Sequence, residues 1–129
     1  MTNDILTRVE FFTLCAKIIL LGSNQNILVA APTRVLCKDF AKQFIGIYNT
    51  VPTWLRKKIV HTTQTSFKFE DGSWIKFESN PNYVRGLSLS FAGIYVGGTA
   101  NKKFAEWTTH LLPALPQRNE TQTRLRRFT

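Results

Sequence analysis

The apolar residues of the chain fall into separate runs whose spacing predicts helices and strands. In a helix over residues 3–21, apolar side chains would occupy most of the circumference, which predicts that the helix is largely buried. Asn3 or Asp4 would cap its start, and Gly22 would end it. The continuous apolar run Ile27–Ala30 follows closely and is typical of an inner strand of a parallel sheet.

A second helix is predicted over residues 34–48, with Thr33 as its N-terminal cap. Large apolar residues recur in it every four positions, so one face should be buried. The opposite side carries Arg34, Lys38, Asp39 and Lys42, and its three basic residues are also four residues apart. This helix is therefore expected to present a basic outer face.

A β-hairpin is predicted where apolar and polar residues alternate on both sides of Asp71-Gly72. A two-residue loop would place Phe67 opposite a lysine. A three-residue loop is preferred, with Phe69 opposite Ile75 and Phe67 opposite Phe77, because it brings all four apolar side chains to one buried face.

The rest of the pattern predicts a short buried strand over Ile94–Val96 and a helix over residues 102–112. Alternating helices and strands favour an α/β fold, with a small, mostly parallel sheet, a β-hairpin and flanking helices. We expect one domain over residues 1–116 and a basic C-terminal tail, frayed or extended, over residues 117–129.

The net charge of the chain favours some classes of function over others. The 129 residues carry a net charge of +9, which favours nucleic acid or another polyanion as a partner, although charge can also serve solubility alone. DNA is the expected partner and no membrane is expected. The nucleic-acid-binding candidates are Arg34, Lys38, Lys42, Arg56, Lys57, Lys58, Lys102, Lys103, Arg124, Arg126 and Arg127.

No metal site is predicted from the cysteines and histidines, because their spacing matches no familiar zinc motif. Cys15 and Cys37 lie in apolar helical patterns and are expected to be buried free thiols in a reducing compartment. The hairpin carboxylates are expected to be solvated rather than catalytic; they are Glu70, Asp71 and Glu78.

A phosphate-binding loop is the first interpretation of residues 91–103, FAGIYVGGTANKK, where a strand runs into glycines and lysines. Counting the phosphate-loop pattern from Gly97 puts Lys103 at the required lysine. It also puts Lys102 where a glycine is needed and Phe104 where a magnesium-binding hydroxyl is needed. A glycine turn between strand and helix therefore fits better.

An ordered set of segments carries a family resemblance: ILVAAPT, a helix, VPTWLRKKI, FKFEDGSWIKFES, VRGLSLS, IYV and LLPAL. Together they resemble the ATPase domain of the large terminase subunit of tailed phages, of the myovirus type, the motor that packages DNA into proheads. The resemblance covers about residues 11–116, and DGS followed by RG and a hydrophobic strand is its most specific part. It implies a fold like part of a P-loop (ASCE-type) NTPase core.

The resemblance assigns roles to three positions. Arg85 corresponds to an arginine before the Walker B strand, proposed in the family to act on the nucleotide of a neighbouring subunit; a loop arginine bonded to local backbone is an equal alternative. Gly97 and Gly98 stand where the family has two acids, one for magnesium and one for activating water. They are degenerate Walker B positions without carboxylates.

The resemblance also implies parts that this sequence lacks. The family's phosphate loop corresponds to NDILTRVEFF, which has neither glycine nor lysine, and Arg8 could mimic only one charge. A further strand ending in a threonine-rich motif would run near TRLRRFT, with Arg126 and Arg127 in place of apolar residues. The nuclease domain is absent. We expect no hydrolysis by this chain alone and no cofactor, with ATP and magnesium binding only if another chain supplies the missing motifs.

Three hypotheses follow. The first is a truncated or degenerate terminase ATPase module, encoded by a phage or prophage and located in the host cytoplasm. The second is a non-enzymatic basic nucleic-acid-binding protein that reuses the fold. The third is an inhibitor or oligomerisation module, because loss of a neighbour beside IYV would expose a sheet edge for another copy or a packaging protein.

Overall fold

The computed structural model describes residues 5–80, 88–97, 104 and 125–129. Two helices and six strands are present in it. In chain order they are α1 (Arg8–Leu21), β1 (Asn26–Ala30), α2 (Arg34–Tyr48), β2 (Ile59–Thr63), β3 (Ser66–Phe69), β4 (Trp74–Glu78), β5 (Phe91–Tyr95) and β6 (Leu125–Phe128).

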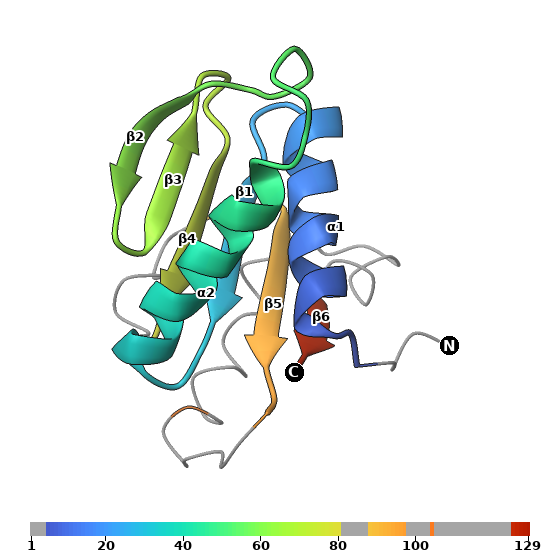
Figure 1. Ribbon diagram of the computed structural model, residues 1–129. Coiled ribbons are helices and arrows are strands. Elements are labelled where there is room, and N and C mark those ends of the chain that lie inside the picture. Colours follow the sequence, from blue (N-terminus) through green and yellow to red (C-terminus); the bar gives the residue numbers. More distant parts are fainter. Residues whose placement is uncertain (1–4, 81–87, 98–103, 105–124) are drawn as a thin grey trace.

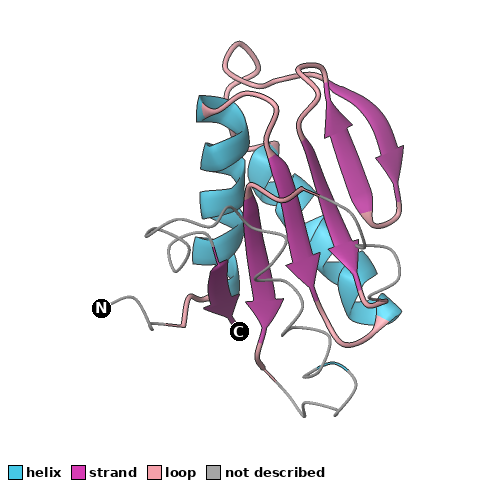
Figure 2. Cartoon of the chain, turned by 180° about the vertical axis from the view of Figure 1, so that it is seen from behind, coloured by secondary structure: helices cyan, strands magenta, loops and turns pink. Residues whose placement is uncertain are grey.

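The strands form one mixed sheet in the order β2-β3-β4-β1-β5-β6. The pairs β4–β1, β1–β5 and β5–β6 are parallel, while β2–β3 and β3–β4 are antiparallel. Both helices cover the same face of this sheet, as Figures 1 and 2 show from opposite sides. The predicted α/β class, with a mostly parallel sheet and a hairpin, is confirmed.

The main core lies between the sheet and the two helices. It is built largely from aromatic rings, and the Phe11 ring stacks on Phe128 with a centroid separation of 4.3 Å. A smaller apolar cluster on the other face contains Leu28, Ala92 and Phe104. No helix within the described ranges is long and apolar enough to cross a membrane.

Helix α1 begins later than predicted. Thr7 is its cap: the Thr7 hydroxyl accepts from the Glu10 backbone N–H, and the Glu10 carboxylate accepts from the Thr7 N–H. This reciprocal pair satisfies two otherwise free donors, so it outcompetes a start at Asn3 or Asp4, which lie outside the described residues. The predicted end at Gly22 is confirmed.

The predictions for β1 and α2 are confirmed. Strand β1 is an inner strand with parallel neighbours on both sides, and four of its five residues are buried. Thr33 caps α2 by accepting from the Leu36 N–H at 3.1 Å.

The hairpin has the predicted buried face but a different register. Phe67 lies opposite Ile75, two residues away from the predicted pairing with Phe77. The three-residue loop is flanked by Phe69 and Ser73, because the Phe69 N–H donates to the Ser73 carbonyl at 2.8 Å. A shift of two residues preserves side-chain direction, so all four apolar side chains remain buried.

Two strands were not predicted. Residues 59–63 form β2 at one edge of the sheet, after a series of turns. Leu125–Phe128, within the stretch expected as a tail, forms β6 beside β5, and Phe128 is fully buried. The prediction of an open edge beside β5 is therefore wrong: β6 occupies it, and the sheet edges are β2 and β6.

Candidate functional site

The carboxyl ends of the parallel strands β1, β5 and β6 meet the N-termini of both helices at one end of the sheet (Figure 1). Open α/β sheets place their ligand sites at this end. Gly97 lies here, two residues after the end of β5. Gly98 and Arg85 lie outside the described residues.

Gly97 has no room for a side chain unless Tyr95 moves. A β-carbon on Gly97 would lie 2.6 Å from the Tyr95 hydroxyl oxygen. The Tyr95 ring is held by Phe40 and Phe128, with centroid separations of 5.0 and 5.6 Å. The space beside Gly97 is thus taken by a packed tyrosine.

Arg8 brings a positive charge to the same end of the sheet. Its guanidinium lies 4.9 Å from the Phe40 ring centroid and 5.8 Å from that of Tyr95, both cation–π distances. Its Nε atom is buried and makes no hydrogen bond. Arg8 therefore packs on aromatic side chains in this structure.

Burial perturbs the titratable groups near the ends of β1 and β4. Burial raises the pKa of the Cys37 thiol to about 12, with a further contribution from the Glu78 carboxylate. The reactive thiolate is therefore scarce at neutral pH. Burial also raises the pKa of Glu78, against the opposing charges of Lys76 and Arg34. Among the described residues no group of three His, Cys, Asp or Glu side chains is arranged to hold a metal ion.

The densest polar cluster lies at the opposite end of the sheet and centres on Lys57. Its ammonium donates to the carbonyl oxygens of Ile19 and Gly22 at the end of α1 and to the Asp71 carboxylate at 2.7 Å. These three acceptors match the three N–H donors of a lysine. Lys57 thus ties the end of α1 to the hairpin and has no donor left for a phosphate.

The Asp-Gly-Ser turn, with which the most specific part of the resemblance begins, completes this cluster. Asp71 accepts from the Ser73 N–H, and the buried Ser73 hydroxyl accepts from the Gln25 N–H at 2.8 Å. Gly72 has a φ of 90°, which side-chain-bearing residues rarely adopt. Each residue of the motif has an architectural reason to be there, because together they fasten the hairpin to the α1–β1 loop.

Acid should weaken this cluster in a defined pH window. Burial works against ionisation of Asp71, but the hydrogen bond from Lys57 and those from Ser73 outweigh it and lower its pKa to about 2. A lowered pKa in the folded state adds stability above the unfolded value near 4 and loses it as pH falls towards 2.

We therefore predict that Asp71→Asn shows a smaller loss of unfolding free energy between about pH 4 and pH 2 than the parent chain. Chemical denaturation at a series of pH values measures this. Parallel pH profiles for the two proteins in that window would contradict the assignment.

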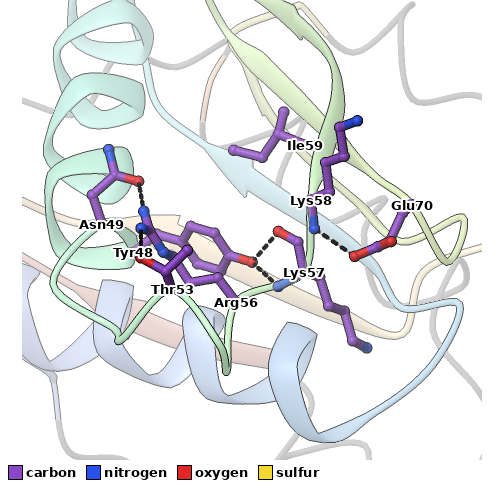
Figure 3. A pocket seen from close by; sticks show the side chains of 8 residues that line it. All are labelled: Tyr48, Asn49, Thr53, Arg56, Lys57, Lys58, Ile59 and Glu70. Atoms are coloured by element: carbon purple, nitrogen blue, oxygen red, sulfur yellow. Dashed lines mark hydrogen bonds between the residues drawn. The ribbon is translucent and has the colours of Figure 1, made fainter.

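A cavity of about 290 Å³ lies beside this cluster, between the end of α2 and the loop that leads to β2 (Figure 3). Arg56 donates from its two terminal nitrogens to Asn49 Oδ1 and Thr53 Oγ1, at 2.9 and 2.8 Å. The Tyr48 hydroxyl exchanges hydrogen bonds with the Lys57 backbone. Arg56 and Lys57, predicted as nucleic-acid-binding candidates, are thus engaged within the fold, whereas the Lys58 side chain is exposed.

The other predicted basic residues are distributed over two surfaces. Arg34 and Lys42 are exposed on α2 with the half-buried Lys38 between them, in one row four residues apart. On β6, Arg127 is exposed and Arg126 lines a groove of about 370 Å³ beside α1. The remaining candidates, Lys102, Lys103 and Arg124, lie outside the described residues.

Sequence reasoning missed a further surface, on the sheet face turned away from the helices. His61, Lys68, Trp74 and Lys76 lie there, on strands β2, β3 and β4. Its signal was present in the hairpin, where basic and aromatic residues alternate with the buried phenylalanines. The alternation was used only to find the buried face.

Comparisons with known proteins add no family. No protein-family model matches the chain, and no curated protein matches its sequence.

Proposed function

We propose that this chain is an ATPase-like module of the terminase large-subunit type that does not hydrolyse nucleotide by itself and acts in or around viral DNA packaging. The observation that supports it most is the end of β5. Strand β5, which is parallel to β1 and preceded by the Asp-Gly-Ser hairpin, ends at Tyr95. Gly97 follows two residues later, and the Tyr95 side chain occupies the space that a carboxylate at position 97 would need.

The neighbouring strand adds support. The resemblance implies a further strand near TRLRRFT, and β6 runs there, parallel to β5 and followed by Thr129. Two arginines interrupt it, but Phe128 fills the core and stacks on Phe11. Strand β6 thus lies where the resemblance implies a strand, although its two arginines depart from the family's apolar residues.

The chemistry expected of the family's site is missing from this sequence. Phosphoryl transfer needs groups that hold magnesium, orient water and neutralise charge on the phosphates. Loss of one such group typically costs orders of magnitude in rate. ATP and magnesium would bind productively only if another chain supplied the phosphate loop and the acids.

A phosphate-release assay tests this proposal. The chain at micromolar concentration, with magnesium and ATP and with or without duplex DNA, is expected to release phosphate at the rate of the buffer blank. DNA-stimulated release above the blank, lost in Arg85→Ala, would show a working ATPase and contradict the proposal.

A second candidate function is nucleic-acid binding without catalysis. The row of Arg34, Lys38 and Lys42 on α2 favours it, since three cations on one helix face can follow a phosphate backbone. Binding of this kind releases counterions, so it must weaken as salt rises.

For this candidate we predict that affinity for a duplex falls by about 100-fold between 50 and 200 mM salt if about four phosphates are neutralised. Fluorescence anisotropy with a labelled duplex measures it, and Lys38→Gln with Lys42→Gln should flatten the slope. An affinity independent of salt would rule this mode out.

We also propose a partner at a sheet edge, at β2 or β6 rather than beside β5. Among the described residues, only Leu6 pairs with the outer side of β6. The Leu6 N–H donates to the Arg127 carbonyl, and the Leu6 carbonyl accepts from the Thr129 N–H. Strand β2 forms the other edge. Another copy or a packaging protein would add to one of these edges.

A further inference from the structure

The face of the hairpin sheet that points away from the helices differs from the buried face. Phe67 and Phe69 of β3 turn towards α2, so Lys68 between them turns the other way. Strand β4 repeats this pattern, with Ile75 and Phe77 in the core. The outward-facing positions of the three strands β2, β3 and β4 therefore form one continuous surface (Figure 2).

The strand register gathers basic and aromatic side chains on that surface. His61 lies opposite Lys68, and Lys68 lies opposite Trp74, so the three form a row across the sheet. Lys76 follows two residues after Trp74, and its ammonium lies 4.7 Å from the centroid of the indole ring. His61 and Lys68 are exposed, and Trp74 is half-buried. We refer to His61, Lys68, Trp74 and Lys76 as the sheet platform.

We propose that the sheet platform binds single-stranded nucleic acid. An unpaired base would stack on the Trp74 ring, and Lys68 and Lys76 would pair with the flanking phosphates. The platform holds two lysines, and the whole chain has a net charge of +9, so it complements a polyanion. The carboxylate nearest along β4 is Glu78, two residues beyond Lys76 and half-buried at the end of the strand.

Trp74 can exchange one partner for another. The Lys76 ammonium now covers the indole, and both side chains are half-buried; a cation–π contact of this kind is typically weaker than stacking of a base on an aromatic side chain. A base would therefore displace the ammonium, which stays within reach of the phosphate of the same nucleotide. The present contact holds both groups close to the arrangement that binding requires.

A single strand fits this surface better than a duplex. Bases in a duplex are stacked on each other and cannot reach an indole that lies on a flat sheet. The basic row on α2, by contrast, contains no aromatic side chain, so it would contact only phosphates. This inference does not depend on the terminase proposal, because it rests on the platform residues alone.

Equilibrium binding measurements test the proposal by comparing variants of the sheet platform with variants of the basic row on α2. Fluorescence anisotropy with a labelled oligothymidine and with a duplex of equal length would be measured at low salt. The oligothymidine should bind more tightly, and Trp74→Leu should weaken it by about tenfold. Lys68→Gln with Lys76→Gln should weaken it similarly, whereas Lys38→Gln with Lys42→Gln, which removes the same charge from α2, should change it by less than about twofold.

Thermal unfolding of each variant accompanies these measurements, because Trp74 packs against the smaller core cluster. If Trp74→Leu does not fold, Lys68→Glu, at an exposed position, carries the test and should weaken binding by at least about tenfold. Tighter binding of the duplex, or equal losses from the platform and α2 variants, would overturn the proposal.

Discussion

Lys57→Met is expected to lower the free energy of unfolding by about 2–3 kcal/mol. The substitution keeps much of the side-chain volume but removes all three donors. Two carbonyl oxygens at the end of α1 and the Asp71 carboxylate would then lose their shared partner. The Lys57 side chain is only 20% exposed, so water cannot fully replace the ammonium.

Lys58→Met is the matched control. Lys58 is the next residue, but its side chain is exposed, and it is the Lys58 backbone N–H that donates to the Glu70 carboxylate. This variant should change stability by less than about 0.5 kcal/mol. Urea unfolding of both proteins decides the matter, and equal effects would mean that Lys57 does not fasten α1 to the hairpin.

Gly93→Ala should destabilise the fold by about 2–4 kcal/mol. Gly93 lies in the middle of β5, and a β-carbon there would overlap the ring of Phe11. Phe11 is fully buried and stacked on Phe128, so its ring cannot move without disturbing the core. Glycine is required at this position by the close approach of α1 to the sheet.

Gly46→Ala is the control for this prediction. Gly46 is exposed within α2, and a β-carbon there would meet nothing within 4 Å. Alanine should stabilise the helix by about 0.5–1 kcal/mol, because it restricts the unfolded chain. Phe11→Leu should also recover part of the stability lost in Gly93→Ala. If Gly93→Ala melts like the parent chain, the described packing of α1 on β5 is incorrect.

Local sequence patterns predicted the helices and strands that are determined by residues close to one another in the chain. The apolar run in β1 follows from burial on both of its faces, whereas the four-residue spacing in α2 and the alternation in the hairpin each follow from one buried face. The cap at Thr7 was also visible in the sequence as Thr followed three residues later by Glu. Asn3 and Asp4 precede the same apolar run and are competing cap signals in the sequence.

Elements stabilised by distant partners could not be predicted in this way. Strand β6 carries two arginines in four residues, and it is a strand because β5 offers it a free side and Phe128 reaches the core. Lys57 looked like one of three equivalent surface cations. Its role depends on two groups that are distant in the sequence. The acceptors at the end of α1 lie 35 or more residues away, and Asp71 lies 14 residues away.

Calorimetric titration of the chain with magnesium and ATP directly tests the claim that this chain has no working nucleotide site of its own. The account predicts no saturable binding at micromolar concentrations, because the phosphate lysine and both carboxylates are absent from the sequence. Micromolar affinity, together with hydrolysis that Arg85→Ala abolishes, would contradict it.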